Sequence, residues 1–356
     1  MTNSNYKNQE GISLFHKYLT FWVVICMVVG VLIGYFIPSI PKFLSKFEYA
    51  QVSIPIAILI WIMIYPMMMK VDFKSVKDVT KNPKGLFITW IINWLIKPFT
   101  MFAISWFFFF VVFKVFITPE LATKYLAGAI LLGAAPCTAM VFVWSHLTKG
   151  NPSYTVVQVA TNNLIILVLF IPIVKLLLGV SNIQVPWNTL ILSVLLFVLI
   201  PLAFGIVTRL FITRKKGKEF FEQIFVKKFD RITIFGLLAM LVLLFMFQGE
   251  VIINNPLHII LIAVPLSIQT LLIFAISFFV SKKAKLSYDI AAPAALIGAS
   301  NFFELSVAMA IAIFGLNSPV VLATIVGVLT EVPLMLFLVK IANKNKNKFI
   351  GGNLNE

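Results

Sequence analysis

Apolar runs long enough to cross a lipid bilayer recur along almost the whole chain. A membrane-spanning helix needs about 20 consecutive, mostly apolar residues, and ten such runs can be placed between short polar or basic segments. They cover approximately residues 19–37, 50–69, 86–113, 123–146, 153–178, 187–211, 231–249, 257–281, 290–314 and 318–341. Because backbone polar groups in lipid must be satisfied internally, these runs predict an all-α polytopic membrane protein with ten transmembrane helices.

The distribution of charge fits a membrane protein better than a nucleic-acid-binding protein. The chain is 60% hydrophobic and 12% charged, yet its formal net charge is +16. Lys and Arg lie in short connections and form no separate basic domain, so membrane lipids are expected partners and nucleic acid is not. The basic connections alternate with weakly charged ones, and they lie at 70–84, 214–231, 282–285 and 340–348. The positive-inside rule then predicts a multi-pass protein of the cell (plasma) membrane with both termini cytoplasmic.

Two of the apolar runs are poor helices at their centres. The first, AILLGAAPCTAMVFVWS at 129–145, contains Gly133 and then Pro136, which lacks a backbone N–H group. The second, AALIGASNFFELSVAM at 294–309, carries Asn301 where the first carries Pro136. A break in lipid is tolerated only against protein or a water-lined cavity, so the pair predicts a transport site.

The two runs belong to a longer internal repeat. A shift of 165 residues aligns Gly133 with Gly298, and a slightly larger shift aligns FAIS at 102–105 with FAIS at 274–277. Each unit holds five predicted spans, and an odd number forces the second unit to enter the membrane from the opposite side. Broken helices in such inverted repeats form substrate sites near the midplane. The predicted regions are an N-terminal tail (1–18), a first repeat (19–178), a second repeat (179–213 and 231–341), a basic cytoplasmic connector (214–230) and a C-terminal tail (342–356).

Glu304 is the strongest chemical signal in the sequence. It lies near the middle of the ninth predicted span, where an ionised carboxylate costs roughly 2.5–3.5 kcal/mol. It must therefore face a cavity, find partners or be protonated. One interpretation is a proton-coupling residue, and the other is a protonated carboxyl that only links helices.

Cys137 follows the first break directly, and it is one of two cysteines in the chain. Buried cysteines usually behave as inert small hydrophobes, and Cys26, with no break beside it, keeps that interpretation. Beside a broken helix, a thiolate is a soft ligand suited to soft ions. We therefore expect Cys137 to bind a soft substrate.

Other polar residues near the breaks join the candidate site. Ser300 and Asn301 can also simply satisfy freed backbone groups, and an Asn pair in a span can be interhelical glue. Lys97, before Pro98, can pair with an acid or extend toward the interface. The predicted substrate-binding residues are Cys137, Thr138, Pro136, Ser300, Asn301, Phe302 and Asn162, and the accessory candidates are Asn163, Glu331 and Lys97.

Motifs of enzymes and ATP-driven pumps are missing from the sequence. It has no Walker A loop, no nucleophile elbow and no dinucleotide glycine motif. We therefore expect neither an enzyme nor a cofactor, while a separate ATPase or chaperone partner is left open.

Several runs together resemble the arsenical-resistance-3 type of arsenite efflux permease, within the bile acid/arsenite/riboflavin transporter superfamily. They are APCTAMVFVWS (135–145), YTVVQVATNNL (154–164), VPW (185–187), GASNFFELSVA (298–308) and VGVLTEVPLM (326–335). The resemblance implies two inverted five-helix repeats, a panel part and a core part, and crossed, broken helices 4 and 9. It places the important cysteine of the family on Cys137 and its important glutamate on Glu304. Where Asn-Asp is expected in span 5, this chain has Asn162 and Asn163, so Asn163 is neutral.

The resemblance implies a secondary active transporter that exports trivalent arsenic hydroxide, and antimonite as a second candidate, by proton antiport and so confers arsenical resistance. Arsenic then meets Cys137 as a substrate, and protons are the coupling ion. Two alternatives remain. One is a sodium-coupled symporter of bile-acid-like organic anions on the same fold, for which Asn301, Glu304, Asn162 and Asn163 could supply oxygen ligands. The other is a non-transporting receptor or scaffold.

Overall fold

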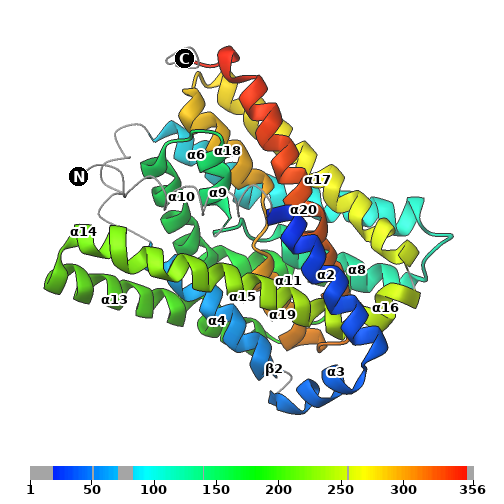
Figure 1. The fold of residues 1–356 in the computed structure, drawn as a ribbon. Helices are drawn as coiled ribbons and strands as arrows, with labels where there is room; N and C mark the ends of the chain where they lie inside the picture. The colour runs from blue at the N-terminus through cyan, green and yellow to red at the C-terminus, as the bar shows by residue number, and fades with distance from the viewer. Residues whose placement is uncertain (1–18, 50–51, 71–82, 139, 255, 351–356) are drawn as a thin grey trace.

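A computed structural model describes residues 19–49, 52–70, 83–138, 140–254 and 256–350. The predicted N-terminal tail 1–18, most of the connection 70–84 and the end of the C-terminal tail lie outside these residues. The described chain is almost entirely helical (Figure 1). A two-residue antiparallel ladder, β1 (Glu48–Tyr49) with β2 (Val52–Ser53), is the exception among the named elements.

The first half of the chain forms α-helices, a 3-10 turn and short π-helical segments inside long rods. They are α2 (Leu19–Phe36), α3 (Ser39–Leu44), the 3-10 turn η1 (Ser45–Phe47), α4 (Ile54–Met69), α6 (Lys84–Ile91), η2 (Ile92–Ile96), α7 (Lys97–Phe107), η3 (Phe108–Val112), α8 (Pro119–Gly133), α9 (Val141–Leu147), α10 (Pro152–Ile165), η4 (Ile166–Phe170) and α11 (Ile171–Val180).

The second half has a similar succession of rods. They are α12 (Trp187–Val194), η5 (Leu195–Leu199), α13 (Ile200–Lys216), α14 (Lys218–Phe220), η6 (Phe221–Phe225), α15 (Val226–Phe247), α16 (Gly249–Asn254), α17 (Pro256–Lys283), α18 (Tyr288–Ala299), α19 (Phe303–Phe314), α20 (Pro319–Lys344) and the 3-10 turn η7 (Lys346–Lys348).

Among the described residues, seven helical rods are long and apolar enough to cross a membrane. They are 84–112, 152–180, 187–216, 218–247, 256–283, 288–314 and 319–344. The prediction of a multi-pass, all-α membrane protein is therefore confirmed. The other three predicted runs fall on shorter pieces. The first is α2, which bends by 88° into α3; the second is the 16-residue α4; and the fourth is divided between α8 and α9.

The helices form two groups (Figure 1). In each group, helices that are far apart in the sequence pack side by side. The panel group contains α2, α4, α15 and the rod that runs through α12, η5 and α13, which pack mainly on one another. The core group contains α6, α7, α8, α10, α17, α18, α19 and α20, with its largest interfaces between α17 and α18 and between α8 and α20. Contacts between the groups are fewer, and they are made mainly by α19 against α12 and α4 and by α2 against α20. The panel and core groups therefore meet along a seam, to which α19 and α20 contribute from the core and α2, α4 and α12 from the panel.

The panel group is held together by a close backbone approach. Gly30 and Gly34 in α2 are four residues apart and face α15. A Cβ atom on Gly30 would lie 2.6 Å from the Val242 carbonyl oxygen, and one on Gly34 would lie 2.0 Å from the Met246 carbonyl oxygen. Small residues at this spacing let helices in membranes approach closely, so neither of these two positions has room for a side chain.

We expect Gly34→Ala to destabilise the panel group. The added methyl group cannot fit against the Met246 carbonyl unless α2 moves, and overpacking of this kind costs about 1–3 kcal/mol. The measurement is the thermal unfolding midpoint of the purified protein in detergent. Gly179→Ala is the matched control, because a Cβ atom there meets no other atom within 4 Å. Equal midpoints for the two variants would contradict the packing described here.

The predicted connector 214–230 is helical in the structure apart from Gly217. α13 ends at Lys216 and α14 begins at Lys218, while Gly217 has a φ of 86°, which favours glycine. A single residue therefore reverses the chain between α13 and the rod that contains α14, η6 and α15. The basic residues of this region extend the ends of the two rods instead of forming a separate loop.

Candidate functional site

The first break lies between α8 and α9, in the run that contains Pro136. α8 ends at Gly133, and α9 starts again at Val141. Pro136, Cys137 and Thr138 lie in the non-helical stretch between them, and all three are buried. The absence of an N–H group on proline explains why the helix does not continue through this stretch.

The second break lies between α18 and α19. Ser300 has extended backbone angles (φ −82°, ψ 152°), and Phe302 precedes the first residue of α19 with φ −84° and ψ 74°. The Ser300 side chain donates a hydrogen bond to the Ile297 carbonyl at 3.1 Å, so it satisfies a carbonyl at the end of α18. The interruption has no proline of its own, and a short polar residue with a local hydrogen bond replaces it.

The two breaks touch each other. The backbone N–H of Phe302 donates to the carbonyl oxygen of Ala135 at 3.1 Å. One turn further on, the Ser306 hydroxyl donates to the Leu131 carbonyl at 2.9 Å, which joins α19 to α8. The segments around Pro136 and Asn301, 165 residues apart, thus meet at one crossing in the interior of the core group.

Lys97 joins the same crossing from the start of α7. Its side chain is fully buried, and its Nζ donates to the Ala135 carbonyl at 3.3 Å and to the Ser300 carbonyl. Each of these carbonyls follows the C-terminal end of a half-helix, where the helix dipole is negative. Lys97 therefore pairs with acceptors inside the protein and does not extend to the membrane interface.

Two carboxyl groups lie beside this ammonium group. Glu331 of α20 accepts a hydrogen bond from the Asn301 backbone N–H at 3.0 Å through Oε1. Glu331 is close enough to interact electrostatically with both Lys97 and Glu304. Glu304 lies in the first turn of α19 with 1% of its surface exposed. Neither its Oε2 nor that of Glu331 has a hydrogen-bond partner among the described residues.

Cys137 completes the group from the other break. Its side chain is 1% exposed, and it is within electrostatic range of Lys97. The Oγ1 atom of Thr138, the next residue, is buried and lacks a hydrogen-bond partner within the described part of the chain. In the described residues, no three His, Cys, Asp or Glu side chains are placed to hold a metal ion together. A soft substrate at the crossing would thus meet one thiol.

Asn162 and Asn163 of α10 are also buried in the core group, but their side-chain hydrogen bonds differ. Asn162 accepts hydrogen bonds through Oδ1 from the Trp94 indole at 3.3 Å and from the Gln158 amide at 3.4 Å. Asn163 is 1% exposed, and neither polar atom of its side chain has a hydrogen-bond partner among the residues described. Asn162 is thus linked through Trp94 to the rod that carries Lys97, while no recorded contact links Asn163 to the crossing.

Sequence reasoning did not single out several buried polar groups of this interior. Asn93 lies one turn before Lys97, Gln158 one turn before Asn162, and Gln269 on α17; all are fully buried. The spacing of four residues between Asn93 and Lys97, and between Gln158 and Asn162, places each pair on one helix face. That spacing was the signal by which two of the three could have been found.

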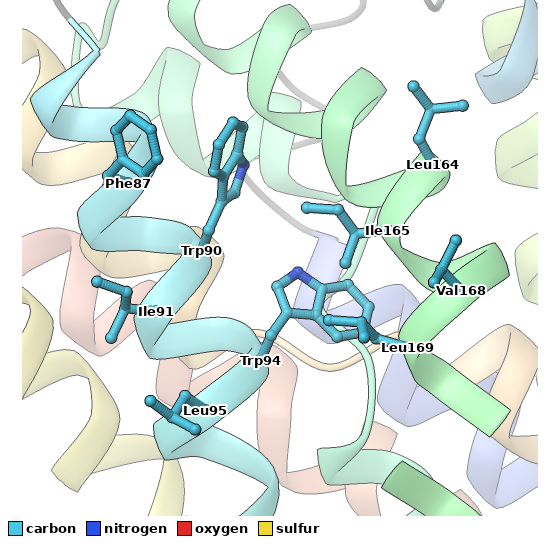
Figure 2. Close-up of a pocket in the computed structure, with 9 residues that line it drawn as sticks. All are labelled: Phe87, Trp90, Ile91, Trp94, Leu95, Leu164, Ile165, Val168 and Leu169. Atoms are coloured by element: carbon cyan, nitrogen blue, oxygen red, sulfur yellow. The ribbon is translucent and has the colours of Figure 1, made fainter. Parts of the chain in front are cut away.

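One hollow of the structure is lined by residues other than those of this crossing. It is an apolar groove of about 670 Å³. Figure 2 shows its two walls, one from the α6–η2 rod (Phe87, Trp90, Ile91, Trp94 and Leu95) and one from the α10–η4 rod (Leu164, Ile165, Val168 and Leu169). Most of these side chains are exposed, as expected for a lipid-facing surface. The crossing itself is closed, since Cys137 and Glu304 are both buried.

Comparisons with known proteins identify relatives over nearly the whole chain. A family model described as the sodium bile acid symporter family matches residues 57–255. The arsenical-resistance protein Acr3 of Alkaliphilus metalliredigens is 59% identical over 350 residues, which cover 98% of each chain. The Acr3 protein of Corynebacterium glutamicum is 32% identical over 95% of this chain and 92% of its own. An uncharacterized transporter of Synechocystis is 49% identical over 94% of this chain and 89% of its own.

Proposed function

This chain belongs to the sodium bile acid symporter family and is of the Acr3 arsenical-resistance type, and we propose that it exports arsenite in exchange for protons. The family consists of transporters, so the chain is a membrane transporter and not an enzyme. Two of its relatives are named as arsenical-resistance proteins. The direction of transport, the coupling ion and antimonite as a second substrate are parts of the proposal.

The observation that carries this proposal is the chemistry of the crossing. One thiol (Cys137), one ammonium (Lys97) and two carboxyl groups (Glu304 and Glu331) are buried together where two interrupted helices meet. Such groups are rare and costly in a membrane interior, and there they mark ion and substrate pathways. A soft ligand beside titratable groups suits a soft, oxygen-bearing solute such as trivalent arsenic.

The thiol can bind arsenic reversibly. Near neutral pH trivalent arsenic is mostly the uncharged As(OH)₃. The Cys137 thiol would form one As–S bond while one As–O bond breaks, and the thiol proton leaves with the hydroxide as water. The arsenic keeps its oxidation state, and water reverses the step on the outer side. A single thiolate allows release, whereas three would hold arsenic too tightly for turnover.

The carboxyl groups supply the coupling. With Lys97 positive and both Glu304 and Glu331 ionised, the buried cluster carries one net negative charge, and a single proton makes it neutral. Glu304 would hold that proton when the site is empty and lose it to the cytoplasm when arsenic binds. Exchange for an inward proton makes export of a neutral solute depend on the membrane potential, which contributes about 2.3 kcal/mol per charge at 100 mV.

The architecture that we propose for this cycle has ten spans. Besides the seven long rods, they are α2 with its bend, α4, and the interrupted pair α8 and α9. The sequence repeat supports two inverted units, 19–178 and 179–213 with 231–341, and the basic connections support cytoplasmic termini in the cell membrane. The core group would rock against the panel group along the seam, and α19, which carries Glu304, lies at that seam.

Sodium-coupled transport of bile-acid-like anions, the alternative on this fold, is less well supported. A 59% identical relative is named for arsenical resistance. In addition, an organic anion would have to enter a cluster that already contains two carboxyl groups beside one ammonium group. Both observations favour a neutral substrate.

The proposal predicts arsenite accumulation in everted membrane vesicles. Respiring vesicles acidify their lumen, so protons leaving through the transporter should drive arsenite inward. We expect a protonophore to abolish uptake and replacement of sodium by choline to leave it unchanged. Expression in an arsenite-sensitive host should restore growth. Uptake that requires sodium and is unaffected by the protonophore would favour the symporter. The absence of both arsenite uptake and protection of the host from arsenite would favour a receptor or scaffold.

A further inference from the structure

The ammonium group of Lys97 occupies an unusual position. It lies between the Ala135 and Ser300 carbonyl oxygens, which belong to two different interrupted helices. Both interruptions present their negative helix ends toward this point. A buried charge requires such compensation, since removing an ammonium group from water costs several kcal/mol. The backbone of the crossing therefore forms a site for one positive charge.

A site of this kind is suited to a small metal cation. In transporters with broken helices, unwound carbonyls and half-helix C-terminal ends coordinate sodium ions or protons. Further hard oxygen atoms are present at these two interruptions and beside them. Thr138 Oγ1, Asn301 Oδ1 and Glu331 Oε2 are buried and accept or donate no hydrogen bond within the described chain. The family to which this chain belongs takes its name from sodium symport.

We propose that the Lys97 ammonium is a tethered cation that occupies the position of a coupling sodium ion and makes this transporter independent of sodium. This inference rests on the proposed function, because a permanently filled cation site leaves the proton as the coupling ion. Lys97 is then a positioning residue that sets ion selectivity. A purely structural cross-link between the two breaks would not create a sodium site when it is removed.

The second half of the sequence indicates that the fold itself does not require a lysine here. The match of FAIS at 102–105 with FAIS at 274–277, a shift of 172 residues, aligns Lys97 with Gln269. Gln269 is also fully buried, and neither polar atom of its side chain has a partner among the described residues. The corresponding helix of the other half is therefore compatible with a neutral side chain at this place. The charge at position 97 is a property of one half alone.

Two substitutions separate the charge of Lys97 from its volume. Lys97→Ala removes the charge and leaves space between the carbonyl oxygens, whereas Lys97→Met removes the charge and fills that space with an apolar chain of similar length. The thermal unfolding midpoint of the purified protein is measured in sodium chloride and in choline chloride at equal ionic strength. We expect the wild type to melt at the same temperature in both salts.

Lys97→Ala should melt lower in choline and be raised by sodium, by about 2–4 °C or more as the concentration increases. Lys97→Met should show no sodium-specific rise. The proposal is overturned if sodium stabilises the wild type, if sodium does not stabilise Lys97→Ala, or if it stabilises Lys97→Met equally. Failure of Lys97→Ala to fold in either salt also contradicts it, since sodium should replace the lost charge.

Transport supplies a second readout that distinguishes this proposal from the proposed function. In everted vesicles, arsenite uptake by Lys97→Ala should depend on sodium, while uptake by the wild type should not. If the wild type carries no arsenite at all, the proposed function fails, and the melting experiment still decides the sodium site. If the wild type carries arsenite and neither measurement of Lys97→Ala responds to sodium, the tethered cation alone fails.

Discussion

Glu304→Gln is expected to reduce proton-driven arsenite uptake to the level of vesicles without the protein, while the protein remains folded. Glutamine mimics a protonated carboxyl group that can never release its proton. The buried cluster would then keep one ammonium group and one carboxylate, Lys97 and Glu331, and could no longer alternate between two charge states. Because Glu304 Oε2 has no hydrogen-bond partner within the described chain, the substitution breaks no recorded contact of that atom.

Two further variants test this prediction. Glu120→Gln is the matched control, since Glu120 is an exposed carboxylate paired with Lys124 at 2.6 Å and a surface pair of this kind contributes little. It should transport like the wild type. Glu304→Asp keeps a titratable group and should retain part of the activity. Proton-driven uptake by Glu304→Gln at the wild-type rate would remove Glu304 from the coupling mechanism.

Cys137→Ser is expected to weaken the apparent affinity for arsenite at least tenfold, which corresponds to about 1.4 kcal/mol. Serine has nearly the same shape but replaces the soft sulfur with a hard oxygen, which binds trivalent arsenic less well. Proton coupling should be retained at saturating arsenite, because the carboxyl groups are unchanged. The measurement is the concentration dependence of uptake in everted vesicles.

The chain provides its own control for this experiment. Cys26 is the second cysteine, and it lies in α2, within the panel group and away from both breaks. Cys26→Ser should leave the concentration dependence unchanged. In that background, arsenite should also protect Cys137 from thiol alkylation during turnover. Equal affinities for Cys137→Ser and Cys26→Ser would show that sulfur takes no part in recognition.

Local features of the sequence predicted the rods and the two breaks. Among the described residues, hydropathy located each of the seven long rods, although 218–230 had been predicted as a connector. Pro136 and the Gly298–Asn301 run marked the interruptions, because helix breaks depend on residues close together in the chain. The sharp bend between α2 and α3 was not predicted, since the first apolar run, 19–37, ends there and carries no information about the direction of the chain beyond it. The sequence predicted that the fourth run is interrupted, but it did not predict the lengths of the two helices, which have 15 and 7 residues.

Contacts between distant residues account for what the sequence could not supply. Lys97 was left between two interpretations, because its acceptors Ala135 and Ser300 lie 38 and 203 residues away. The link from Trp94 to Asn162 spans 68 residues and was not foreseen. Hydropathy and local breaks carry no information about which buried donor meets which acceptor. The roles proposed for Cys137, Glu304 and the residues around them remain predictions.

The seam between the panel and core groups has a consequence for how the turnover rate of such a transporter could be changed. The glycines of α2 lie directly against the backbone of α15, so these two helices would move together as one body. The resistance to movement between the panel and core groups would then be set where α12 and α4 contact α19. Among the described residues, none of the hydrogen bonds at the crossing involves α12 or α4. If the core group moves against the panel group as proposed, turnover speed and choice of solute would be governed by different surfaces, and a substitution at one surface would leave the property set by the other unchanged.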